Sequence, residues 1–175
     1  MVSIPSTEQV WTWLADVSDP EIPVISIVDL GIVRDVRWHE CAQGSECVVT
    51  ITPTYSGCPA THVIADSVVQ QLRDRGVDRV RLEYRIAPAW TTDWLSDEGK
   101  RKLHAYGIDP PSGSAAEQAV RVQDIGRGPR ATAGVSCPRC GSGDVALTSQ
   151  FGSTPCKALY RCCRCLEPFD HFKCH

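Results

Sequence analysis

The sequence has no apolar run long enough to mark a membrane protein. Within its 175 residues, no stretch approaches the roughly 18 apolar residues of a membrane-spanning helix. The first five residues also lack a basic segment followed by an apolar one, so they form no recognisable secretory signal. We therefore expect a cytoplasmic protein that does not bind membranes.

Several patterns of catalytic and cofactor-binding proteins are missing as well. The chain has no Gly-rich dinucleotide loop, no Glu-x-x-His pair of the di-iron type and no Cys-x4-Cys-x2-Cys run of plant-type ferredoxins. Its net charge of −3 gives no indication of nucleic-acid binding. These absences agree with a protein that is not an enzyme and that does not bind nucleic acid.

Cysteine, in contrast, is abundant, with ten residues in the chain. In a secreted protein this number would indicate disulfides. Here the missing signal and the Cys-x-x-Cys pairs favour a reducing compartment and metal binding.

The apolar pattern predicts a small α+β domain over residues 1–106. The expected elements, in order, are a helix at about 6–17, strands at about 31–38 and 46–52, a helix at about 60–75, a strand at 80–86 and a helix at 94–106. This α-β-β-α-β-α order predicts a three-stranded sheet with helices on one face. Residues 107–134 are rich in glycine and proline without sustained periodicity, so we predict a linker there.

Residues 135–175 carry two Cys-x-x-Cys pairs, which predict a zinc ribbon. Cys137 and Cys140 form the first pair, and Cys162 and Cys165 form the second after 21 intervening residues. Four thiolates in two such turns can bind one tetrahedral ion at roughly 2.3 Å. A module this small cannot bury enough apolar surface to fold alone. We therefore expect one structural zinc ion per chain.

Three more cysteines lie near these pairs, and their roles stay open. They are Cys156, Cys163 and Cys174. Cys156 precedes Lys157, whose charge would favour the thiolate form. Cys156 or Cys174 could replace a ligand of the ribbon or bind iron transiently. The alternative, for each, is a spare thiol on a small module.

The stretch at residues 52–60 presents Cys58 in a turn between a strand and a helix. Pro59 suits the first position of a helix, which would place Cys58 at or near the N-cap. The positive end of a helix dipole favours a thiolate, the form that attacks electrophiles and binds metals. The alternative is a small buried residue that caps the helix.

Three motifs resemble the SufT-like, MIP18-type iron–sulfur assembly domain. They are Asp19-Pro20-Glu21-Ile22 leading to Asp29-Leu30-Gly31-Ile32-Val33, then Thr52-Pro53-Thr54 with Gly57-Cys58-Pro59, and Pro88-Ala89-Trp90-Thr91-Thr92-Asp93-Trp94-Leu95. The ribbon adds Phe151-Gly152-Ser153-Thr154 and Glu167-Pro168-Phe169-Asp170. With both parts together, the chain is similar to the D subunits of bacterial phenylacetyl-CoA epoxidase (ring 1,2-oxygenase) systems.

The resemblance implies an accessory factor that helps to mature the epoxidase complex. The client would be the iron–sulfur reductase subunit or the di-iron oxygenase subunit, with the reductase favoured and homo-oligomerisation left open. Cys58 would hold or hand over iron or an iron–sulfur cluster, assisted by Asp19 or Glu21. A second hypothesis is an adaptor subunit without metal transfer. A third, ranked last, is a thiol enzyme with Cys58 as nucleophile and His62 as base.

Overall fold

The computed structural model describes residues 4–42, 44–55, 57–112 and 134–173. Its elements, in chain order, are α1 (Thr7–Leu14), β1 (Val33–Cys41), β2 (Gly44–Ile51), α2 (Thr61–Asp74), β3 (Val80–Tyr84), the 3-10 helix η1 (Thr92–Trp94), α3 (Asp97–Tyr106), β4 (Ile108–Asp109), β5 (Val145–Ser149), β6 (Lys157–Cys162) and β7 (Pro168–Phe172). The chain divides into unit 1, Met1–Trp90 with Trp94–Gly99, and unit 2, Thr91–Asp93 with Lys100–His175. No helix among the described residues is long and apolar enough to cross a membrane.

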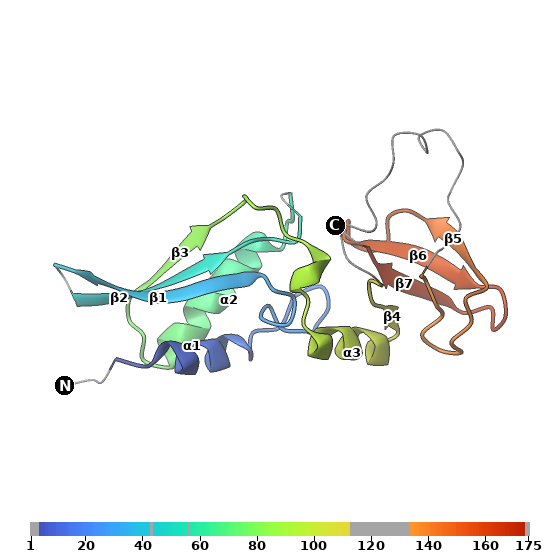
Figure 1. The fold of residues 1–175 in the computed structure, drawn as a ribbon. Coiled ribbons are helices and arrows are strands. Elements are labelled where there is room, and N and C mark those ends of the chain that lie inside the picture. Colours follow the sequence, from blue (N-terminus) through green and yellow to red (C-terminus); the bar gives the residue numbers. More distant parts are fainter. Residues whose placement is uncertain (1–3, 43, 56, 113–133, 174–175) are drawn as a thin grey trace. The chain divides into compact units, whose positions relative to one another are not determined.

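Unit 1 contains a three-stranded sheet in the order β1-β2-β3, which confirms the predicted α+β class. β1 runs antiparallel to β2, and β3 runs parallel to β2. Helix α2 lies behind the sheet in Figure 1, and α1 packs against α2 and β1. All five residues of β2 from Cys47 to Ile51 are almost fully buried. The opposite, open face of the sheet carries a network of ion pairs.

Helix α1 begins where the sequence predicts, and the last predicted helix begins later. Ser6 caps α1, because its side chain accepts from the Gln9 N–H while Gln9 bonds back to the Ser6 N–H. The last helix was expected from Trp94, but α3 starts at Asp97 after the short helix η1. Ser96 takes the capping position, since its hydroxyl accepts the Gly99 N–H at 2.8 Å.

The apolar loop between α1 and β1 packs tightly against residues near η1. Trp90 Nε1 donates to the Leu30 carbonyl at 2.8 Å. Gly31 has a φ of +67°, and a Cβ there would lie 2.5 Å from the Trp94 carbonyl oxygen. Only glycine therefore fits this position without displacing the backbone of Trp94. The first and third motifs of the sequence meet here in space.

Unit 2 contains a four-stranded sheet in the order β4-β7-β6-β5. Its strand β4 lies within the range predicted as a linker, and it pairs in parallel with β7. The buried Asp109 also accepts a hydrogen bond from Ser136 at 3.1 Å and lies 2.7 Å from His171 Nδ1. This part of the predicted linker is therefore a strand with a tertiary role. Residues 113–133 of that prediction lie outside the described residues.

Candidate metal centre and cysteine loop

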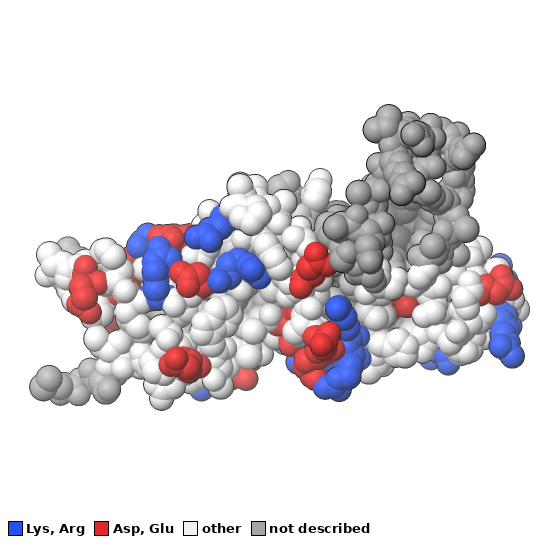
Figure 2. Space-filling model, in the orientation of Figure 1, with Lys and Arg blue, Asp and Glu red and all other residues white. Residues whose placement is uncertain are grey.

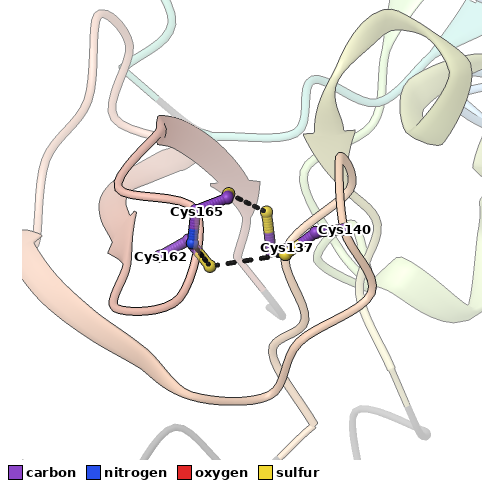
Figure 3. Close-up of side chains that lie close together, drawn as sticks. All are labelled: Cys137, Cys140, Cys162 and Cys165. Carbon is purple, nitrogen blue, oxygen red and sulfur yellow. Dashed lines mark hydrogen bonds between the residues drawn. The ribbon is translucent and has the colours of Figure 1, made fainter.

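Four cysteine sulfurs converge at one end of the unit 2 sheet (Figure 3). They belong to Cys137, Cys140, Cys162 and Cys165, and all lie within 4.8 Å of one another. The Cys137 and Cys165 sulfurs are 3.7 Å apart, and those of Cys140 and Cys162 are 3.6 Å apart. The structure thus brings together the four residues that the sequence predicts as ligands.

The two cysteine pairs lie in backbone turns that share the same pattern of hydrogen bonds. The N–H of Gly141 donates to the Cys137 carbonyl at 2.8 Å, and the N–H of Leu166 donates to the Cys162 carbonyl at 3.0 Å. The N–H of Cys137 bonds the carbonyl of Ser142 and that of Cys162 bonds the carbonyl of Glu167, each at 2.9 Å. Gly141 and Leu166 both have left-handed backbones, with φ of 70° and 66°. Each turn points two sulfurs toward the same centre.

The geometry of the four sulfurs fits a tetrahedral zinc ion. Zinc–sulfur bonds of about 2.3 Å imply sulfur–sulfur edges of about 3.8 Å in a regular tetrahedron. The Cys137–Cys165 and Cys140–Cys162 sulfur distances are close to this edge and far longer than a disulfide bond of about 2.05 Å. Val135 and Phe169 pack around the two buried cysteines, Cys137 and Cys162. The four cysteines would hold the ion as a closed structural site.

Backbone N–H groups at the second turn favour a thiolate at Cys162. The N–H of Cys165 lies 3.4 Å from the Cys162 sulfur. This donor is the largest cause that lowers the pKa of Cys162 to about 6, and the N–H of Arg164 adds to it. Because zinc binds thiolate rather than thiol, this turn holds one ligand in the form that the metal requires.

In unit 1, the Cys58 loop follows β2 and borders a small cavity of about 10 Å³. The residues that line it are Asp19, Ile32, Ile51, Pro53, Thr54, Cys58, Thr61 and Ile64. The buried Asp19 carboxylate accepts the N–H groups of Glu21 and Ile22 at 2.9 and 2.8 Å, which orients it. Of the two acids predicted to assist Cys58, the structure brings Asp19 to the cavity, whereas Glu21 is exposed and does not line it.

Cys58 lies two residues before the N-cap of the following helix, so it is near the cap, as the sequence allowed, but not at it. Helix α2 begins at Thr61, and its N-cap is Ala60, which offers no side-chain acceptor. The Thr61 hydroxyl instead donates to the Cys58 carbonyl at 2.9 Å and ties the loop to the helix. Sequence analysis missed this role of Thr61, although a threonine at the start of a helix commonly bonds nearby backbone.

The thiol-enzyme hypothesis loses its geometric basis with this correction. It assumed that Cys58 and His62 lie one turn apart on a helix, but Cys58 precedes the helix. His62 is exposed and does not line the cavity.

The remaining described cysteines have different surroundings from these two sites. Cys47 is fully buried, and burial raises its pKa to about 11. Cys41 is exposed, and Arg79 Nη1 donates to its sulfur at 3.3 Å, a cationic neighbour that the sequence did not reveal. Cys156 lies outside the four-sulfur group, with its sulfur 3.0 Å from the Thr154 hydroxyl. Cys163 is also outside the group, and Cys174 lies beyond the described residues.

Comparison with known proteins matches both units. Residues 7–81 match the iron–sulfur cluster assembly protein family, and residues 123–173 match the PaaD zinc beta ribbon domain. An Escherichia coli protein named as the D component of a 1,2-phenylacetyl-CoA epoxidase is 41% identical over 173 residues, covering 99% of this chain and 96% of the relative.

Two further proteins match about half of the chain. The Fe-S protein maturation auxiliary factor YitW of Bacillus subtilis is 35% identical over 97 residues, covering 55% of this chain and 91% of that protein. The crystal structure of a domain of unknown function from Bacillus anthracis has 30% identity and a TM-score of 0.49, covering 55% of this chain and 89% of that one.

Proposed function

Because this chain belongs to the family of 1,2-phenylacetyl-CoA epoxidase D subunits, we propose that it is a maturation factor of the epoxidase complex in phenylacetate degradation. In this proposal it works in the cytoplasm and assists the insertion of iron or an iron–sulfur cluster into another subunit. The favoured client is the iron–sulfur reductase subunit, and the alternative client is the oxygenase subunit. The family and the assembly domain support the accessory role.

The observation that carries the proposal is the shared cavity of Asp19 and Cys58. A thiolate and a carboxylate are both iron ligands, and here they line one small space. Two protein ligands leave the coordination of an iron ion incomplete. An incomplete site releases its ion more readily than a closed one, so it suits transfer.

The size of the cavity also limits what it can carry. A volume of about 10 Å³ is roughly that of one water-sized sphere. The cavity therefore has room for a single iron ion. An iron–sulfur cluster held here would need further ligands supplied by a partner. The four-cysteine site has the complete ligand set of structural zinc, so we assign the transfer step to unit 1.

Replacement of Cys58 tests the transfer step. We expect Cys58→Ala to fold normally, because the loss of one half-buried side chain should cost only about 1 kcal/mol. We expect it to lower the iron and sulfide content of the reductase or oxygenase subunit produced with it in the absence of oxygen. Cys41→Ala is the matched control, since Cys41 is an exposed thiol of the same unit. Unchanged iron and sulfide in both subunits would favour the adaptor role instead.

Asp19→Asn provides a second test of the same cavity. The asparagine keeps an oxygen that can accept the N–H groups of Glu21 and Ile22 but removes the negative charge. We expect the fold to persist and the iron content of the client to fall, as with Cys58→Ala. Glu21→Gln should have no such effect, because Glu21 does not line the cavity.

A further inference from the structure

Strand β3 forms one edge of the unit 1 sheet, and in the described part of the chain no strand pairs with its outer side (Figure 1). On its inner side, the carbonyl of Arg79 and the N–H of Arg85 both bond β2 at 2.9 Å. Because the N–H and C=O groups of successive residues point to opposite sides of a strand, every second residue between these two points outward. The outward-facing residues are Val80, Leu82 and Tyr84.

β3 lacks the features that usually keep an edge strand from pairing. The edge strands β1 and β5 each have a register shift, whereas the register of β3 with β2 is regular. β3 also contains no proline. Bulges and prolines are common means of protecting a sheet edge. Tyr84 is 51% exposed and Leu82 is half-buried, so apolar side chains border the open backbone groups.

The charges on β3 complement those on a second copy of the same strand. Arg81 and Glu83 belong to the ion pairs of the open face, and Figure 2 shows positive and negative side chains interspersed over the strands of unit 1. In an antiparallel pair centred on Leu82, Arg81 of each copy lies opposite Glu83 of the other. A shift of two residues in either direction would place two arginines or two glutamates opposite each other, which is destabilising.

We propose that β3 pairs antiparallel with β3 of a second copy of this chain, so that the two unit 1 sheets join into one. The centred register also gives the largest overlap, because Leu82 pairs with its counterpart and each Val80 pairs with a Tyr84. These pairs exchange two hydrogen bonds each, and a β-branched residue beside an aromatic one is a favourable cross-strand pair. Backbone bonds and apolar contact supply the affinity, and the charges fix the register. The dimer goes beyond the maturation role and does not depend on it.

The same register brings one unfavourable pair together just outside β3. It places Arg79 of each copy opposite Arg85 of the other, although Arg79 also donates to the Cys41 sulfur at 3.3 Å. Like charges directly opposite each other weaken a strand pair. Arg85→Glu would turn this repulsion into an attraction, so it should tighten the dimer.

The dimer keeps the two Cys58 cavities apart. β2 runs parallel to β3, and the Cys58 loop follows the end of β2 that pairs with Tyr84. Because the two β3 strands run antiparallel, the two loops lie at opposite ends of the shared edge. Pairing of this kind therefore does not bring two Cys58 thiols into one site.

The test measures dimerisation of the full-length protein by sedimentation velocity, at concentrations up to about 100 μM. We expect the wild-type protein to dimerise, and Arg81→Glu and Glu83→Arg each to raise the dimer Kd by about tenfold or more. An equimolar mixture of these two variants should recover the wild-type affinity, because every acidic side chain of one variant then faces a basic one of the other. Arg73→Glu is the matched control, since it makes the same charge change at an exposed position on α2. Circular dichroism verifies the fold of each variant.

Recovery of the dimer on mixing, together with a tighter Arg85→Glu dimer, supports the proposal. A wild-type protein that stays monomeric overturns it, and so do charge variants that dimerise with wild-type affinity. If both variants are monomeric and their mixture does not dimerise, the antiparallel register is wrong. Leu82→Pro removes an outward N–H that β2 does not use. If the wild-type protein is monomeric and this variant binds the purified reductase or oxygenase subunit more weakly, the edge pairs with a client strand and the assignment to a second copy is wrong.

Discussion

Leu166 occupies a backbone conformation that the matching turn assigns to glycine. Its φ of 66° corresponds to the 70° of Gly141, and a residue with a side chain pays about 1–2 kcal/mol in this region. Leu166 is also 59% exposed, so its side chain contributes little packing. The bonds of the second turn, together with the metal that both turns would bind, must offset this strain.

The matched turns predict different responses to substitution. Leu166→Gly should change the free energy of unfolding of unit 2 by less than about 1 kcal/mol, because relief of strain offsets the greater freedom of glycine in the unfolded chain. Gly141→Ala should destabilise it by about 1 kcal/mol or more, although a Cβ there meets open space. Denaturant unfolding of the zinc-loaded protein measures both changes. Equal losses would contradict the argument from backbone conformation.

Burial predicts which thiol of unit 1 resists modification. With its pKa raised to about 11, Cys47 has about one thiolate in a thousand molecules at pH 8, and its side chain is inaccessible. We expect an alkylating reagent to label Cys41 and Cys58 in the folded protein and Cys47 only after denaturation. Peptide mapping by mass spectrometry gives the three rates. Labelling of Cys47 as fast as Cys41 would show that the sheet opens readily.

At the scale of elements, the start of α3 depends on one hydroxyl. Ser96 accepts the Gly99 N–H and donates to Asp29 Oδ1 at 2.9 Å, so it joins the helix to the loop before β1. We expect Ser96→Ala to lower the free energy of unfolding by about 1–2 kcal/mol. Thr91→Ala is the comparison, because the Thr91 hydroxyl accepts the Asp93 N–H at the start of η1 and makes no bond to α3. Thermal unfolding measures both changes, and equal losses would contradict the particular role of Ser96.

Local patterns in the sequence predicted the parts of the fold that depend on local bonds. The start of α1 near residue 6, the end of α2 near residue 75 and the four converging cysteines all follow from patterns within a few residues. The strand β4 could not be predicted this way, because two residues show no periodicity and their partner strand lies some 60 positions away. The approach of Asp19 to Cys58 likewise depends on tertiary packing that neither motif encodes alone.

At the scale of the whole molecule, each unit has its own core and its own candidate site. Unit 1 contains the sheet β1-β2-β3 and the cavity of Cys58, and unit 2 contains the sheet β4-β7-β6-β5 and the four cysteines. Loss of one site should therefore leave the other unit folded. This separation also means that the zinc site and the transfer cavity can be tested independently in the full-length chain.

Cys140→Ser tests the independence of the two units. The wild-type protein should contain about one zinc ion per chain, and the small core around Val135 and Phe169 depends on that metal for its stability. Removal of one thiolate should release the zinc and unfold residues 135–173, while unit 1 keeps its dispersed amide signals in NMR spectra. Cys163→Ser is the matched control, because the Cys163 thiol neighbours a ligand in the sequence but lies outside the four-sulfur group. This variant should retain both its zinc ion and its fold. Elemental analysis and spectra of the same samples provide the measurement. If the Cys140→Ser protein keeps a full complement of zinc, or if unit 1 unfolds along with the ribbon, the two-unit description is wrong.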